Sequence, residues 1–354
     1  MPPSQSSVPA EVWLRAAGAP ESEAAFTPSD GFNCSAFRVR LPGARDGQRM
    51  HALAEAPNWD TLRARPSFYG NPLLFPFAYG IKDGMLRYGG RDRQLTPTRW
   101  GRVAHGLVRD HAWTVERQWE DHHGAHLLAA ITTASDPDAL AAFPFPFRLA
   151  ITYVLTPGQL TLRAEARNLG DSPMPFGFGI HPYLPLPLGS TGQPSPESGP
   201  LDEIVTSDAT HANVEGPGAS GTPRSDLPPV AGAFDLRRGQ PAAALFDAQL
   251  AHRDRPGLYI TYGKTPGPTG LFWSLSSPRL GAAVEIETSP ELWAMVLFAP
   301  PGKEVISPVI GTCLPGFLDH TNDPRRSADL GLLDLEPGQD WSCTATFRVR
   351  PLSG

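Results

Sequence analysis

Residue types that could move protons or hold hydroxyl groups are concentrated in a few short segments of the chain. One segment, Gly177 to Tyr183, reads GFGIHPY and places His181 directly before a proline. Proline holds the preceding residue in an extended conformation, and glycines beside bulky aromatics let backbones approach closely. A rigid edge then presents one imidazole, as a general acid or base requires. A histidine that only packs in an aromatic turn fits the same residues.

A second segment, Trp100 to Trp113, reads WGRVAHGLVRDHAW and brings His105, Arg109 and Asp110 close together in sequence. An arginine fork is a natural donor to sugar hydroxyls or to a carboxylate. The alternative is a surface loop with an ordinary Arg/Asp pair. Both readings remain open from residue types alone.

A third group is His122, His123 and His126, three imidazoles within five residues. Their spacing suits neither one face of a strand nor a zinc motif, and neither a carboxylate nor a cysteine completes a convincing set. We expect a solvated turn and no metal site. The sequence also lacks a G-x-S-x-G motif, a P-loop and a G-x-G-x-x-G motif that opens a helix.

Composition limits the fold and the partners. The 354 residues include 40 prolines and 35 glycines, which favours many short elements over a helical bundle. The net charge of −6 comes without a basic run, so we expect no nucleic-acid partner. The three cysteines, Cys34, Cys313 and Cys343, are far apart, and we expect neither a disulfide framework nor a zinc site.

The N-terminal residues are expected to form a loose tail, residues 1–30, before the folded part begins. Residues 1–10 lack the basic-then-apolar order of a secretory signal, and no stretch of about 20 apolar residues would span a membrane. We therefore expect no membrane partner and a cytoplasmic location. The sequence does not indicate an oligomeric state.

Alternating apolar and polar residues predict strands along most of the chain. Residues 148–156 and 159–167 both alternate with period 2, and the Thr156-Pro157-Gly158 turn between them predicts a hairpin. Helical periodicity is weak, with a turn or two expected at 59–65. We expect an all-β sandwich. Further strands are predicted at 34–41, 125–133, 257–263, 270–276, 282–288, 292–298 and 341–350.

The segment 185–229 is rich in proline, glycine and serine. A linker between two domains is one interpretation, and an elaborated loop within one domain is the other. Strand patterns on both sides look alike, so we predict one β-sandwich domain over residues 31–354, with this segment as a loop.

Five segments in order resemble the aldose 1-epimerase (galactose mutarotase-like) family. The resemblance implies a large antiparallel β sandwich of the galactose mutarotase type, an isomerase of carbohydrate metabolism, a small-molecule sugar as partner, and neither a metal nor an organic cofactor. The segments are GNPLLFPFAYGIKDG (70–84), AHGLVRDHAW (104–113), FPFPFRLAITYVL (143–155), NLGDSPMPFGFGIHPYLPLP (168–187) and VISPVIGTCLPGF (305–317).

In that family a base takes the proton from the anomeric hydroxyl while an acid protonates the ring oxygen, so the ring opens and recloses as the other anomer. By resemblance His181 falls on the acid histidine and His105 on the second histidine, both catalytic. Arg109 falls on the arginine of the H-G-x-x-R-D pattern. The resemblance also implies that Arg109, Tyr79 and Asp110 bind the substrate.

Three positions depart from the family pattern. The family's second arginine falls on Gly80, its glutamate base falls on Val309, and its aspartate falls among residues 242–244, which are alanines. Valine cannot accept a proton, and glycine cannot bind a hydroxyl through a side chain. The catalytic set that the resemblance implies is therefore incomplete.

Three functions remain open. One is an active epimerase with a displaced base, for which Glu285, Glu287, Glu304 and Asp247 are candidates. A second is a weak or inactive carbohydrate-binding relative that acts as a sensor or carrier. A third is a different reaction, such as a lyase or hydrolase, which would need a pair of carboxylates across a cleft.

Overall fold

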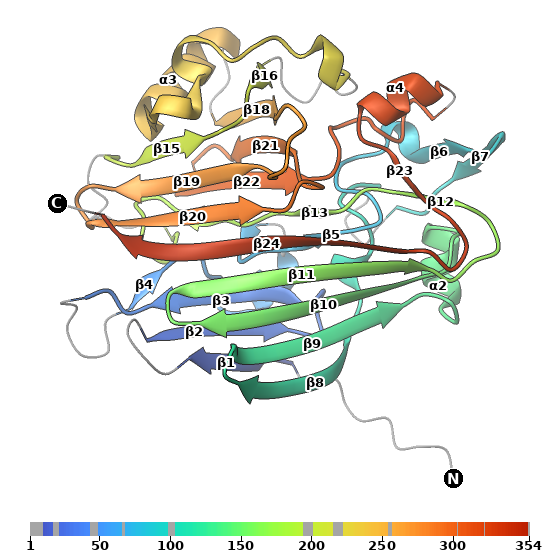
Figure 1. Ribbon diagram of the computed structural model, residues 1–354, viewed down its shortest axis with the longest axis horizontal. Coiled ribbons are helices and arrows are strands. Elements are labelled where there is room, and N and C mark those ends of the chain that lie inside the picture. The colour runs from blue at the N-terminus through green and yellow to red at the C-terminus, as the bar shows by residue number, and fades with distance from the viewer. Residues whose placement is uncertain are drawn as a thin grey trace.

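The structure, a computed structural model, is built mainly from antiparallel strands (Figure 1). This confirms the predicted all-β, antiparallel fold. The structure describes residues 10–16, 21–42, 49–65, 68–97, 103–193, 201–214, 222–253, 257–302, 304–321 and 323–352.

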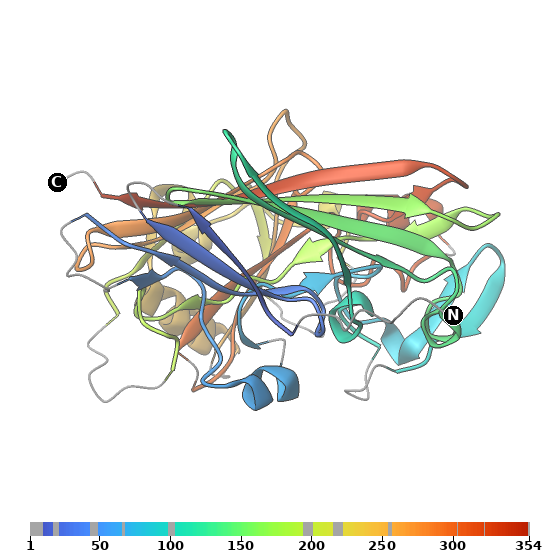
Figure 2. The ribbon, with the colours of Figure 1, turned by 90° about the horizontal axis from the view of Figure 1, so that it is seen from below.

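The largest sheet has nine strands and brings together segments from the middle and the end of the chain. Its strand order is β17 (Gln240–Pro241), β15 (Ile204–Ser207), β19 (Phe272–Ser277), β20 (Ala282–Thr288), β24 (Asp340–Pro351), β11 (Gln159–Asn168), β10 (Phe147–Thr156), β9 (Gly124–Thr132) and β8 (Thr114–Asp121). Its long strands β24, β11 and β10 form one layer, and α1 (Trp59–Ala64) lies on the opposite side of the molecule (Figure 2).

A second sheet positions the candidate site. Its order is β16 (His211–Asn213), β18 (Leu258–Gly263), β21 (Ala294–Ala299), β22 (Val305–Gly311), β13 (Gly179–Ile180) and β5 (Leu73–Leu74), with β14 (Leu184–Pro185) also paired to β22. Every residue of β22 is buried, and β22 lies between β21 and β13 in the sheet. This strand carries Ser307 and Val309.

The remaining strands form smaller units. A four-stranded sheet and two strand pairs comprise β1 (Val12–Ala16), β2 (Ser22–Thr27), β3 (Asn33–Val39) and β4 (Met50–His51); β12 (Met174–Phe176) with β23 (Leu333–Leu335); and β6 (Met85–Tyr88) with β7 (Arg91–Gln94).

The β10–β11 hairpin shows why the sequence pattern predicts the fold. Leu160, Leu162 and Ala164 on β11 are buried, whereas the intervening Arg163 and Glu165 are exposed. The two strands pair in register along their whole length, and the turn closes at Gly158, whose φ of 72° suits glycine. Alternation therefore places one face of the sheet in the core, as predicted.

The expected loose tail over residues 1–30 is wrong for the part that the structure describes. Strands β1 and β2 lie within it, and every residue of β2 is buried. Phe26 packs against Tyr153 of β10 with ring centroids 4.5 Å apart, so this segment covers the large sheet. The alanine-rich sequence of β2 gave little strand signal. Residues 1–9 lie outside the described residues.

The segment 185–229 is more regular than predicted. It holds β15 and β16, and β15 pairs with β19 in the nine-stranded sheet. Strands before and after the segment lie in that same sheet, so the sheet continues across it. Residues 194–200 and 215–221 fall outside the described residues.

Helices are short and peripheral. They are α1, α2 (Pro137–Ala142), α3 (Ala242–Arg253) and α4 (Pro324–Asp329). The short helix expected near 59–65 is confirmed by α1, whereas α3 gave too little helical periodicity to be predicted. In the part of the chain that the structure describes, no helix is long and apolar enough to cross a membrane.

Candidate active site

A cavity of about 770 Å³ lies where β18, β21 and β22 meet the segments around Tyr79, His105 and His181. Its size falls in the range of small-molecule sites. Much of its wall is aromatic, from Phe68, Tyr183, Tyr259, Phe298 and Tyr79. The two histidines that the sequence singles out line the same cavity, although 76 residues separate them.

His181 follows the short strand β13, and its backbone N–H donates to Pro72 O at 3.1 Å. Its side chain is buried, with 3% of the residue exposed. The imidazole stacks on the Tyr183 ring at a centroid distance of 4.5 Å and an interplanar angle of 13°. The rigid edge expected from the sequence is therefore present in the structure.

Hydrogen bonds define the protonation of His181. Ser307 Oγ donates to the Pro182 carbonyl at 2.7 Å, so it accepts from His181 Nδ1 at 2.8 Å. The proton of the neutral ring therefore sits on Nδ1, and Nε2 accepts from the Tyr183 hydroxyl at 3.1 Å. Burial, then His105 and Arg109, lower the pKa of His181 well below its usual value, which keeps the ring neutral.

His105 lies beside His181, with ring centroids 5.5 Å apart. Its Nδ1 lies 2.9 Å from the Ala78 carbonyl, which can only accept, so Nδ1 carries the proton and Nε2 is the acceptor nitrogen. Burial and then the charge of Arg109 lower the pKa of His105 to about 4. The backbone of His105 is left-handed, with φ of 62°, a strained conformation that is common at functional sites.

Two of the three positions that depart from the family pattern, Val309 and Gly80, also line this cavity. Val309 on β22 forms part of the wall and is buried, with 3% of the residue exposed. Gly80 lies in the wall next to Tyr79, whose hydroxyl donates to the Val309 carbonyl at 3.4 Å. The cavity therefore holds two neutral imidazoles, and an aliphatic side chain stands where the resemblance places a carboxylate.

Comparisons with known proteins show the family of the chain. A sequence model of the aldose 1-epimerase family matches residues 42–199. The uncharacterised protein YphB of Escherichia coli K12 is 32% identical over 285 residues, which cover 78% of this chain and 82% of YphB. The chain belongs to the aldose 1-epimerase family. A second relative, the uncharacterised E. coli protein YihR, is 30% identical over 126 residues, which cover 34% of this chain and 38% of YihR.

Solved structures with this fold are more distant in sequence. A galactose mutarotase-like protein from Clostridium acetobutylicum has a TM-score of 0.77 at 18% identity, over 96% of this chain and 95% of that protein. A galactose 1-epimerase from Lactobacillus acidophilus NCFM has a TM-score of 0.65 at 18% identity, over 97% of this chain and 99% of that protein. These likenesses confirm the mutarotase-type fold.

Arg109 and Asp110 lie in a short helical turn, Val108–Asp110, that follows His105 in the chain. Arg109 is buried, with 5% of the residue exposed, and its Nε lies 3.6 Å from Asp110 Oδ1. Neither residue is among the described residues that line the cavity. The positive charge of Arg109 nevertheless lowers the pKa of both His105 and His181. Direct contact of this pair with a substrate stays a prediction.

Two carboxylates in the cavity wall, Asp83 and Asp319, were missed at the sequence level. Asp319 Oδ1 accepts the backbone N–H of Lys82 at 2.7 Å, and burial raises the pKa of its carboxyl. Asp319 lies two residues after the VISPVIGTCLPGF segment, so a search continued past that segment would have found it. Only the tertiary fold brings this turn to residue 82.

The carboxylates proposed from the sequence as displaced bases lie elsewhere. Glu285 and Glu287 form ion pairs with Arg350 and Arg348 on the nine-stranded sheet. Asp247 lies on α3, and none of these three, nor Glu304, is among the described residues lining the cavity. Residues 242–244, expected to match the family's aspartate, begin α3, and they too are absent from that described lining.

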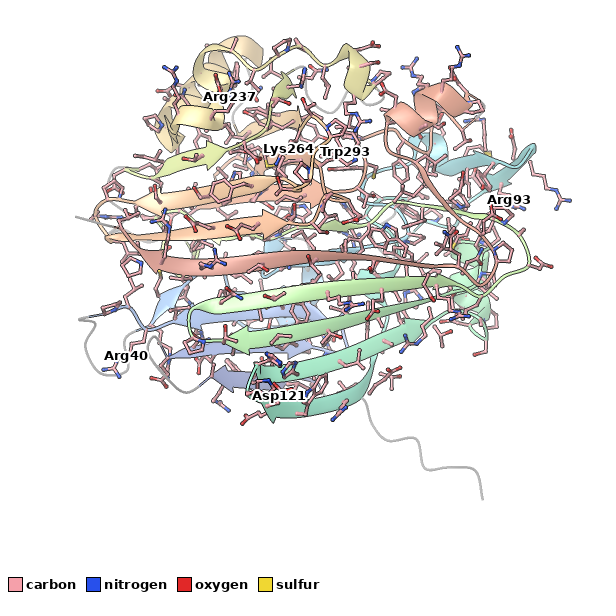
Figure 3. All side chains as sticks on the ribbon, viewed as in Figure 1. Arg40, Arg93, Asp121, Arg237, Lys264 and Trp293 are labelled. Carbon is pink, nitrogen blue, oxygen red and sulfur yellow. The ribbon has the colours of Figure 1, made fainter. Side chains whose placement is uncertain are left out.

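The third histidine group lies at the β8–β9 turn, on the edge of the nine-stranded sheet. His126 Nε2 pairs with Asp121 Oδ1 at 2.9 Å and stacks on Trp119, while the His122 and His123 rings are 3.8 Å apart. Figure 3 shows Asp121 at the outer edge of the molecule. Over the residues that the structure describes, no group of three or more histidine, cysteine or acidic side chains is arranged to hold a metal ion.

Proposed function

We propose that the chain binds a free aldose in the cavity and interconverts its α and β anomers by ring opening. The observation that carries this proposal is the pair of neutral imidazoles, His105 and His181, in the wall of one cavity of sugar size. Membership of the aldose 1-epimerase family supports it.

The cavity wall suits the two kinds of surface that a sugar ring presents. The C–H faces of a pyranose are apolar and would pack on aromatic walls such as Tyr183, Tyr259 and Phe298. The hydroxyl rim needs acceptors and donors, which the imidazoles, the phenols and Asp319 supply. Shape and polarity therefore both favour a monosaccharide over an extended polymer.

Anomer exchange requires loss of the proton from the anomeric hydroxyl and gain of a proton by the ring oxygen. A neutral imidazole at physiological pH accepts a proton, and a positioned base of this kind contributes roughly 10²–10⁴-fold. The lowered pKa of both rings keeps them in the accepting form. The reaction therefore begins from a site that can take a proton without a glutamate at position 309.

A second candidate function is carbohydrate binding without turnover, as a sensor or carrier. The observation that favours it is Val309, which stands in the cavity wall where the family has its base, together with Gly80. Under this alternative the sugar would stabilise the protein, whereas the rate of anomer exchange would equal that in buffer.

Exchange spectroscopy by proton NMR separates the two functions. Cross-peaks between the α and β anomeric protons at equilibrium report interconversion for any aldose, without isolating one anomer. We expect protein-dependent cross-peaks with at least one aldose, and their loss in His181→Ala. Thermal stabilisation by a sugar without any exchange would instead establish the binding function.

We further propose a cytoplasmic location for the protein. The three cysteines are free and buried, which agrees with a reducing compartment. Fractionation of cells that express the full-length protein would test this directly, with recovery outside the cytoplasm as the contradicting result.

A further inference from the structure

We infer that the Tyr183 hydroxyl is the group that exchanges protons with the sugar, and that His181 acts as the base behind it. This inference rests on the proposed anomer exchange and names a catalytic residue for it. Tyr183 lines the cavity and touches His181 through both a hydrogen bond and ring stacking.

The direction of each hydrogen bond in this chain follows from chemistry. The Pro182 carbonyl accepts from Ser307, Ser307 accepts from His181 Nδ1, and Nε2 of the same ring accepts from Tyr183. Each link has only one possible direction, because a carbonyl cannot donate and a neutral imidazole carries one proton. Tyr183 Oη therefore keeps its lone pairs for another partner.

Tyr183 and His181 both line the cavity. The lone pair of His181 Nε2 is already engaged by the Tyr183 proton, so a sugar hydroxyl meets Tyr183 Oη first. The backbone fixes the phenol in place, since Tyr183 N donates to Gly70 O at 2.8 Å and its carbonyl accepts from Ala54 N at 2.7 Å. Ala54, Val305 and Phe68 pack around it.

The proton path balances without another acid or base. The sugar O1–H bond breaks as its proton joins Tyr183 Oη, and the Tyr183 proton moves to His181 Nε2 in the same step. The electron pair left on O1 forms the carbonyl bond to C1, while the C1–O5 bond breaks and its pair passes to O5. The imidazolium then returns a proton through Tyr183 to O5. Reclosure on the other carbonyl face runs these steps in reverse.

This relay explains how the site can work with valine at position 309. O1 and O5 are bonded to the same carbon, so one phenol can serve both in turn. Burial raises the pKa of Tyr183 well above its usual value, so the phenol passes a proton along and does not rest as a phenolate. Ser307 is a positioning residue, because its acceptor oxygen holds the His181 proton on Nδ1.

The test is Tyr183→Phe, which keeps the ring and its packing but removes the hydroxyl. We expect kcat for anomer exchange to fall about 10²-fold, with sugar affinity by thermal shift changed far less. Rates in mixtures of H₂O and D₂O give a second readout. If two protons move in one step, the wild-type kcat depends on the deuterium fraction of the solvent along a curve. The residual kcat of the variant depends on it linearly.

Two further variants keep the test independent of folding. Tyr262→Phe removes a buried phenol that is not among the described residues lining the cavity, and it is expected to leave both kcat and KM unchanged. Ser307→Ala removes the acceptor for Nδ1, so the ring proton is free to move to Nε2, and we expect a loss of kcat with folding verified by circular dichroism.

The outcomes separate the relay from the proposed function. A wild-type protein that exchanges anomers with a linear isotope dependence, and a Tyr183→Phe variant with unchanged kcat, would overturn the relay and leave the function standing. A wild-type protein that exchanges no aldose would overturn the proposed function and the relay together.

Discussion

Two groups of histidines in this protein differ both in their spacing along the sequence and in their surroundings. His105 and His181 are far apart in sequence but face one another in a cavity, with each ring proton held by a buried acceptor. His122 and His123 lie at the exposed β8–β9 turn, and His126 follows on β9, where it is buried with 7% of the residue exposed. Their ring contacts are with one another, Trp119 and Asp121.

The difference shows that the surroundings of an imidazole, and not the number of imidazoles nearby, decide whether it can form a catalytic site. Burial lowers the pKa of His105 and His181, and fixed hydrogen bonds choose their tautomers. His122 and His123 are exposed, so water competes for their contacts, whereas the buried His126 ring is engaged by Trp119 and Asp121. The predictions below test whether this contrast holds.

Replacing one histidine from each group gives the largest expected contrast. His181→Ala removes a ring that lines the cavity, and we expect a loss of roughly 10²–10⁴-fold in kcat/KM for anomer exchange. The matched change, His126→Ala, should leave exchange unchanged, because that ring lies on β9, pairs with Asp121 and is not among the described residues that line the cavity. If both variants lost kcat/KM equally at the same folded fraction, the two groups of histidines would not differ in function.

Restoring a carboxylate in the cavity is expected to raise activity. Val309→Glu places a carboxylate where the resemblance to the family puts its glutamate base, and we expect kcat to rise about tenfold, at a cost of about 1–3 kcal/mol in stability for burying the carboxyl. Val296 pairs across the sheet with Val309 and lines the same cavity, so Val296→Glu is the control. An equal gain from both substitutions would show that position 309 is not special.

Low pH should destabilise the folded protein through the protonation of His105. Burial lowers the pKa of His105 to about 4, from 6.5 in the unfolded chain. Between these values the unfolded state binds more protons, so the free energy of unfolding falls as pH drops from about 6.5 to 4. Because the His105 ring is partly exposed, we expect the free energy of unfolding to fall by about 2 kcal/mol over this pH range.

His105→Asn is the matched variant for this measurement, since asparagine tolerates the left-handed backbone at this position. Urea unfolding of both proteins between pH 7 and pH 4 should show a shallower loss in the variant. Parallel curves would mean that His105 is not held neutral in the folded state.

The smallest expected effect is at the exposed turn. We expect Zn²⁺ to raise the melting temperature of the wild-type protein no more than that of a His122→Ala/His123→Ala double variant. The double variant itself should change stability by less than about 0.5 kcal/mol. Stabilisation by zinc that disappears in the double variant would establish a metal site there.

Much of the fold could be predicted because its long strands carry their burial pattern locally. The pattern in β10, β11 and β24 alternates cleanly, and each was predicted within two residues of its observed bounds. Strands β1 and β2 were missed because their burial depends on packing against the large sheet. Short or alanine-rich strands carry too weak an alternating pattern for the sequence to predict their packing against the large sheet.

The candidate site divides in the same way. His181 and His105 stand in motifs, so residue types pointed to them. Tyr183 and Asp319 gain their place in the cavity from hydrogen bonds to distant or stacked neighbours, which the sequence does not display. Arg109 is not among the described residues that line the cavity, its charge lowers the pKa of both histidines, and its contact with a substrate stays a prediction.

The most direct test of the central claim is polarimetry of freshly dissolved α-glucose and α-galactose with the wild-type protein. The account predicts that the optical rotation reaches equilibrium faster with at least one sugar, in proportion to protein concentration. It also predicts that, with His181→Ala, the rotation reaches equilibrium only as fast as in buffer without protein. A wild-type rate equal to that in buffer for both sugars, under conditions where either sugar raises the melting temperature, would contradict anomer exchange and leave a sugar-binding protein.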